Sequence, residues 1–291
     1  MEIDFDLSVA IKKYLVSNIS LSIDLIDDDK VDLEIKVHKI RTNIKKIRGS
    51  LRLIREYLPE YKKLNIEFRD MARRLADYRD ATSAIEALDR LTEYHSSQLY
   101  KTTFKKIKAS LIKHQETLQY RNNINLILTE IKDQLIKSLE KAKDFDFQKS
   151  FKSIKKGLSK VYEKGQKIEK QINIEPSPSL LHEWRKQVKY HAGHLQIIFP
   201  LWPELFSAFI NEYYRLSNYL GEDRDLYLLK KSIENNPDSI SSESESELIN
   251  ALIDFNNSKL QSSALTLGRK LYSISTNEYI KFLGSGFKQT L

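Results

Sequence analysis

The chain has 291 residues and carries 48 Lys and Arg against 40 Asp and Glu, a formal net charge of +8 that favours an acidic partner. It contains no cysteine, which excludes disulfides, thiolate metal ligands and cysteine nucleophiles. The N-terminus, MEIDFDLS, lacks a signal pattern, and no apolar run approaches the roughly 18 residues needed to span a bilayer. We therefore expect a cytoplasmic protein that makes no membrane contact.

Apolar residues recur near the 3.6-residue period of a helix along most of the chain, and only 8 Gly and 6 Pro interrupt it. No segment alternates with period two for long enough to require a strand, so the predicted fold class is all-α. Ser244 and Glu247 are expected to form a capping box, and the tail at Gly284 to Gly286 is expected to be frayed. The predicted helices span residues 6–27, 30–57, 61–94, 97–143 (as one or two helices), 147–170, 180–199, 203–234 and 246–274.

The predicted helix at 30–57 is strongly basic. On a helical wheel one row of its charged residues falls within an arc of roughly 80°, about 120° from the centre of the apolar stripe. A row that borders the buried face must look into a groove or cavity, and the repulsion between its charges is most simply offset by an external polyanion. No Asp or Glu interrupts residues 36 to 55, and the row consists of His38, Arg41, Lys45, Arg48 and Arg52.

The sequence contains an internal repeat. LHEWRKQVKYHAGHL (181–195) aligns with VHKIRTNIKKIRGSL (37–51), and LGEDRD (220–225) aligns with LADYRD (75–80). The distance from the histidine to the arginine of the Arg-Asp pair is 41 residues in the first copy and 42 in the second. The repeat predicts two similar helical bundles related by a pseudo-twofold axis, residues 1–172 and 173–291, divided at NIEPSPS (173–179). Ala192 and Gln196 replace Arg48 and Arg52 in the second copy, so the first is expected to supply more charge.

At the segments HKIRTNIKKIR and HEWRKQVKY, each followed by an Arg-Asp pair, the sequence resembles the CHAD family, the conserved histidine α-helical domain. The resemblance covers nearly the whole chain. It implies a pair of antiparallel four-helix bundles around a basic central cavity, and non-catalytic binding of inorganic polyphosphate. The residues that match the family's basic motif are His38, Arg41, Lys45, Lys46, Arg48, His182, Arg185, Lys186 and Lys189.

Three further arginines are candidates for the same site. Arg52 extends the basic row, whereas Arg79 and Arg224 either reach the ligand or form ion pairs that orient the basic helices. His38 and His182 either contact the anion, which would raise the pKa of each imidazole, or are held by local packing. Polyphosphate granules are a candidate location for such a protein.

Two other functions remain open: binding of the RNA or DNA backbone, and phosphotransfer through a phosphohistidine. The sequence shows no Walker loop and no carboxylate cluster, so neither an enzyme nor a cofactor is predicted. His191 and His194 border an apolar face without companion carboxylates, so no metal site is predicted. His95 and His114 are expected at the surface.

Overall fold

The structure is a computed structural model that describes residues 6–97, 99, 103–145 and 150–289. Throughout these ranges it contains helices and no strand, which confirms the predicted all-α class. Two short 3-10 helices, η1 (Phe199–Leu201) and η2 (Pro237–Ser239), flank the longest helix. The α-helices in chain order are α1 (Leu7–Asp27), α2 (Leu33–Leu53), α3 (Tyr61–Arg74), α4 (Ala76–Tyr94), α5 (Lys105–Arg121), α6 (Ile124–Lys143), α7 (Phe151–Ile174), α8 (Pro178–Ile198), α9 (Pro203–Glu234), α10 (Glu243–Leu271) and α11 (Thr276–Gln289).

Local sequence signals determine where several helices begin. The Asp6 carboxylate accepts a hydrogen bond from the backbone N–H of Ser8 at 2.9 Å and so caps α1. Ser177 caps α8, whose first residue is Pro178, a position that needs no N–H donor. Asn123 adopts a φ of 43°, which asparagine tolerates better than most residues, and its side chain caps α6.

Three predictions about helix limits are wrong. The predicted helix at 61–94 is interrupted at Leu75, whose φ of −99° and ψ of 6° separate α3 from α4. The cap of α10 is Ser242, which accepts from the backbone N–H of Glu245, so the capping residues lie two positions before the predicted pair. The glycine-containing tail is helical in α11 because its apolar side chains pack on α7; a Cβ at Gly284 would lie only 2.8 Å from the ring of Phe151.

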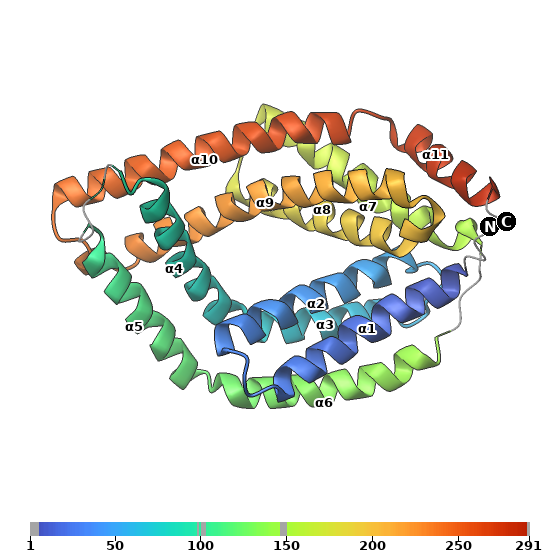
Figure 1. Ribbon diagram of the computed structural model, residues 1–291, viewed down its shortest axis with the longest axis horizontal. Helices are drawn as coiled ribbons and strands as arrows, with labels where there is room; N and C mark the ends of the chain where they lie inside the picture. The colour runs from blue at the N-terminus through green and yellow to red at the C-terminus, as the bar shows by residue number, and fades with distance from the viewer. Residues whose placement is uncertain (1–5, 98, 100–102, 146–149, 290–291) are drawn as a thin grey trace.

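The helices form two groups that meet along α2 and α8 (Figure 1). One group contains α1, α2, α3 and α6; the other contains α7, α8, α11 and the adjoining parts of α9 and α10. A pair of helices, α4 and α5, packs with the far ends of α9 and α10 at one end of the molecule (Figure 1). The two repeats therefore place their basic helices, α2 and α8, directly against each other.

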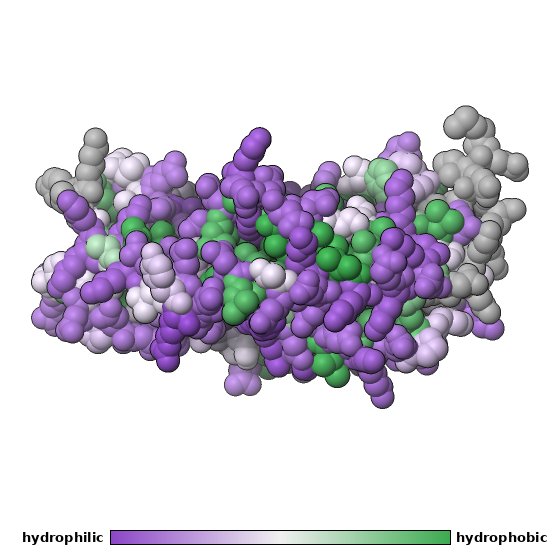
Figure 2. Space-filling view, turned by 90° about the horizontal axis from the view of Figure 1, so that it is seen from below, coloured by the Kyte–Doolittle hydropathy of each residue, from purple (hydrophilic) through white to green (hydrophobic). Residues whose placement is uncertain are grey.

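Two hydrophobic clusters hold this arrangement together. The larger runs through both groups of helices and includes Ile44 and Leu51 of α2 together with Trp184 and Val188 of α8. The smaller joins α4 and α5 to the far ends of α9 and α10. The face seen in Figure 2 is largely hydrophilic, with small hydrophobic areas between the polar side chains.

The contact between α2 and α8 is close because small residues lie at the crossing. A Cβ on Gly49 would lie 3.4 Å from the ring of Tyr190, and His194 Nε2 lies 2.9 Å from the Gly49 carbonyl oxygen. The division of the chain at residue 173 and the pseudo-twofold axis stay predictions. Helix α7, which that division assigns to the first half, packs against α8, α10 and α11 as well as α2.

Candidate functional site

A cavity of about 560 Å³ lies between the basic faces of α2 and α8. Helix α2 lines it with Arg41, Lys45, Arg48 and Arg52, four of the five residues of the predicted row. The apolar stripe of the same helix, including Ile40, Ile44 and Ile47, is fully buried. The basic row therefore borders the core and faces a hollow, as its position on the helical wheel predicts.

Helix α8 supplies the opposite wall with His182, Arg185, Lys186 and Lys189. These four residues are the second copy of the motif, so the structure brings the two repeats to one cavity. The position of the two motifs in the chain, 144 residues apart, does not show how close they lie in space.

Residues that the sequence reasoning did not include complete the lining. They are Arg55 after α2, Arg69 and Arg73 of α3, and Lys160 and Lys164 of α7. The lysines of α7 follow an i,i+4 spacing, and that spacing was a signal available in the sequence. Arg69 and Arg73 both contact Asp70, at 2.8 and 3.8 Å, yet still line the cavity.

The charge of the lining is almost entirely of one sign. Twelve Lys or Arg residues line the cavity, against one carboxylate, that of Glu183, among the residues that the structure describes. Burial alone would raise the pKa of the Glu183 carboxyl, but hydrogen bonds from Lys164 and Lys186 lower this pKa to about 2. The one carboxylate of the described lining is thus already engaged by two lysines.

Arg41 and Arg185 are anchored in the same way at equivalent positions of the repeat. Arg41 Nη1 donates to the carbonyl oxygen of Ala72, and Arg185 Nε donates to the carbonyl oxygen of Ser217 at 3.3 Å. Both acceptors lie three residues before the aligned leucines of the Arg-Asp motifs. Each guanidinium is therefore held at one edge by a neighbouring helix. Arg41 Nε is buried and has no hydrogen-bond partner within the described ranges.

Arg48 and Arg52 converge on one asparagine. Arg48 Nε and Arg52 Nη1 both donate to Asn65 Oδ1 of α3, at 3.2 and 2.7 Å. The Arg52 guanidinium also stacks on the Tyr190 ring, with 4.3 Å between Cζ and the ring centroid. These contacts fix two arginines at the cavity wall without neutralising either charge.

Two lysines that line the cavity, one from α2 and one from α8, have strongly lowered pKa values. Burial, followed by the charge of Arg185, lowers the pKa of Lys189 from 10.5 to about 7. Burial, followed by the charges of Arg41 and Lys189, lowers the pKa of Lys45 well below its ordinary value. Both shifts have the direction expected for a buried ammonium group that has other positive charges around it.

The two motif histidines occupy different positions. His182 lines the cavity, and its Nδ1 is buried without a hydrogen-bond partner in the described part of the chain. His38 lies outside the lining and is more exposed than His182. Desolvation, followed by the positive charge of one arginine (Arg79 for His38, Arg224 for His182), lowers the pKa of each imidazole to about 4, so both are neutral near pH 7.

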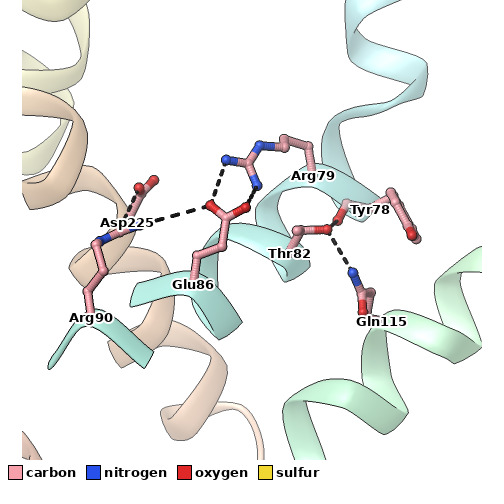
Figure 3. Close-up of polar contacts among 7 residues, drawn as sticks. All are labelled: Tyr78, Arg79, Thr82, Glu86, Arg90, Gln115 and Asp225. Atoms are coloured by element: carbon pink, nitrogen blue, oxygen red, sulfur yellow. Dashed lines mark hydrogen bonds and ion pairs between the residues drawn. The ribbon is translucent and has the colours of Figure 1, made fainter. Parts of the chain in front are cut away.

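Lys46, Arg79 and Arg224 also lie outside the cavity lining. Arg79 donates to both carboxylate oxygens of Glu86, at 3.0 and 2.9 Å, within the network drawn in Figure 3. The second Arg-Asp motif forms ion pairs with α4: Arg224 lies 3.9 Å from Asp80 of the first motif, and Asp225 accepts from Arg90 at 2.9 Å. This geometry favours the ion-pair alternative for Arg79 and Arg224.

The remaining histidines have structural environments. His191 Nε2 lies 2.8 Å from the Tyr279 hydroxyl, and His194 contacts the Gly49 carbonyl, both in the core. No group of three or more His, Asp or Glu side chains among the described residues is arranged to hold a metal ion. His95 is buried and lies 3.1 Å from Asn256, so its predicted surface position is wrong, whereas His114 is exposed. None of the described helices is both long and apolar enough to cross a membrane.

Comparison with known proteins agrees with this architecture. The chain is similar to the crystal structure of the CHAD domain from the plant Ricinus communis, with a TM-score of 0.61 and 14% sequence identity over 94% of this chain and 96% of that chain. At this identity the likeness shows the fold alone. A comparison with curated proteins found no match. The family model of the CHAD domain matches residues 28–234, which is more than half of the sequence and includes both basic motifs, and the chain therefore belongs to the CHAD family.

Proposed function

We propose that the protein binds inorganic polyphosphate in the cavity between α2 and α8. The observation that supports this most strongly is the lining itself, in which twelve Lys and Arg side chains face a hollow of about 560 Å³ with one carboxylate among them. An unbranched chain of phosphates supplies many negative charges in a small cross-section. It can therefore enter such a space and neutralise positive charges on several walls of the cavity at once.

The arginines are suited to phosphate because a guanidinium presents several donors in one plane. Arg41 and Arg185 each use one edge on a backbone carbonyl, and this anchoring fixes the direction in which the remaining donors point. Anchored donors lose less conformational freedom when the ligand arrives. The nearby phosphates also favour the charged forms of Lys45 and Lys189, whose pKa values are lowered by burial and by neighbouring positive charges.

The proposed role is binding without catalysis. The cavity's one described carboxylate, Glu183, is held by Lys164 and Lys186 and has a pKa of about 2, so it is a poor general base. The proposal includes a cytoplasmic location, with polyphosphate granules as the candidate site.

Binding of nucleic acid is the competing function, since the same cations would attract any phosphate backbone. Two tyrosines, Tyr61 and Tyr190, are the aromatic residues of the described lining, and the Tyr190 ring is already stacked by Arg52. Single-stranded nucleic acid gains much of its affinity from bases stacked on free aromatic rings. The cavity therefore suits a ligand made of phosphates without bases.

A competition measurement tests the proposal. Labelled polyphosphate is bound at about 150 mM salt, where weak nonspecific association is suppressed, and is then challenged with RNA and with duplex DNA. We expect unlabelled polyphosphate to displace the label and nucleic acid to fail at equal phosphate concentration. Displacement by nucleic acid at that concentration contradicts the proposal.

A cavity variant locates the site. Replacing both Lys45 and Lys189 by methionine removes two mutually repelling charges, so we expect the variant to fold and to bind at least about tenfold more weakly. The matched control replaces Lys137 and Lys141, two exposed lysines on α6 that lie outside the cavity lining. Equal loss in both variants would mean that net charge, and not the cavity, determines binding.

A further inference from the structure

Helix α7 carries a row of lysines at constant spacing. Lys152, Lys156, Lys160 and Lys164, which we call the lysine stripe, follow one another at i,i+4. Each step turns about 40° around the helix and advances about 6 Å, so the stripe extends for about 18 Å along one flank. All four residues are exposed.

The stripe passes from the cavity into a second hollow. Lys164 and Lys160 line the cavity, whereas Lys156 and Lys152 line an adjoining hollow of about 540 Å³, together with Lys155. The two hollows are also adjacent just after the end of α2. Arg55 lines the first hollow, and Glu56, the next residue, lines the second.

The packing of α7 on α2 fixes this geometry. A Cβ on Gly157 would lie 2.0 Å from the carbonyl oxygen of Leu53, so only glycine permits the two backbones to approach this closely. The contact lies between Lys156 and Lys160 in the sequence of α7, which is where the stripe crosses from one hollow to the other. The close backbone contact between α7 and the end of α2 therefore lies at the border between the two hollows.

Glu56 occupies this border. Its carboxylate accepts hydrogen bonds from Lys160 at 2.7 Å and from Lys156 at 3.0 Å, one lysine from each hollow. These two hydrogen bonds lower the pKa of the carboxyl to about 2, so it is ionised at any physiological pH. In the free protein the Glu56 carboxylate thus binds the same two lysines, Lys156 and Lys160, that a phosphate group crossing the border would contact.

We propose that the second hollow is an exit groove: a polyphosphate chain longer than the cavity continues past Glu56 onto Lys156, Lys155 and Lys152. The protein then binds long chains more tightly than short ones, because only a long chain reaches both hollows. This inference rests on the proposed function and adds to it a second subsite and a preference for chain length. Glu56 acts as a competitor that the ligand displaces.

The test compares long-chain polyphosphate with inorganic triphosphate on the full-length chain. In the variant Lys152→Met/Lys156→Met we expect the affinity for the long chain to fall about three- to tenfold, the size expected for two exposed charge contacts. The affinity for triphosphate, which fits within the cavity, should change less than about twofold. Glu56→Gln should strengthen binding of the long chain. Lys137→Met/Lys141→Met on α6 is the matched control for lost charge.

Each result has a defined meaning. Equal affinity of the wild-type protein for both ligands, or equal losses in the α7 and α6 variants, overturns the exit groove while leaving cavity binding in place. A parallel loss of triphosphate affinity in the α7 variant also overturns it, because the lysines would then act on the cavity itself. Failure of the wild-type protein to bind either ligand overturns the proposed function, and the exit groove with it.

Discussion

Replacing Lys189 by methionine should change how the stability of the free protein depends on pH. The lysine projects into a cavity already crowded by Arg185, and its pKa in the folded chain is about 7, against 10.5 for an ordinary lysine. At pH values between about 7 and 10.5, the unfolded chain therefore binds about one more proton at this site than the folded chain. Stability should rise with pH across that window, because the folded state is the one that readily gives up the proton.

The magnitude follows from the difference between the two pKa values. At about 1.36 kcal/mol per unit, a fully desolvated lysine would destabilise the fold by about 5 kcal/mol at low pH. Lys189 is partly open to the cavity, and solvent screening reduces the expected effect to roughly 1–3 kcal/mol. The cost is fully present below pH 7 and is relieved as the pH rises towards 10.5.

Urea unfolding of the wild-type protein and of Lys189→Met at pH 6, 7, 8 and 9 measures this effect, with the midpoint as the readout. We expect the variant to be the more stable protein at pH 6, with an advantage that narrows at pH 8 and 9. Lys137→Met, at an exposed position on α6, serves as the control. A difference between variant and wild type that stays constant from pH 6 to pH 9 would refute the reasoning, because Lys189 would then titrate near its ordinary pKa.

The remaining predictions concern ligand binding and packing. Polyphosphate affinity should strengthen as the pH falls from 9 to 7, since protonation of Lys189 restores a positive charge. Titration calorimetry in buffers of different ionisation enthalpy should show that binding at pH 8 is accompanied by proton uptake. The variant Lys189→Met should take up fewer protons on binding. Gly157→Ala should lower the free energy of unfolding by about 1–3 kcal/mol, because the added Cβ would meet a backbone oxygen of α2. In the control Gly286→Ala the added Cβ would meet nothing within 4 Å, so the melting temperature should stay nearly unchanged. Equal effects of the two substitutions would contradict the packing argument. Glu86→Gln should destabilise by about 1–3 kcal/mol because it removes the carboxylate that holds the largely buried Arg79, and an unchanged melting temperature would count against that pair.

We expect histidine protonation to contribute less to the proposed binding than protonation of Lys189. The pKa of His182 is lowered to about 4 in the free protein, so the imidazole is neutral from pH 6 to pH 8. A change in affinity over that range is better explained by Lys189, whose pKa of about 7 falls within it. The histidine and lysine interpretations both predict tighter binding at lower pH, and they differ in the side chain that takes up the proton.

The local features of the protein could be predicted from the sequence because they depend on neighbours within a few turns. The period of apolar residues predicts most of the helices, and the angle between the charged and apolar rows of α2 predicts that Arg41 and Lys45 border the core. The same reasoning failed at Leu75 and at the tail. At the tail, helix formation depends on packing against a distant segment, as the contact of Gly284 with Phe151 illustrates.

Only the tertiary structure determined how the cavity is assembled and charged. Lys160 and Lys164 join the site because Gly157 brings α7 onto the end of α2, a contact over about a hundred residues of sequence. Arg79 belongs to an Arg-Asp motif and was a candidate for the site, but its side chain pairs with Glu86 and does not line the cavity. The lowered pKa of Lys189 likewise arises from burial and from charges on other turns and helices. Helical periodicity is a property of the local chain, whereas desolvation and the meeting of distant charges exist only once the helices have packed.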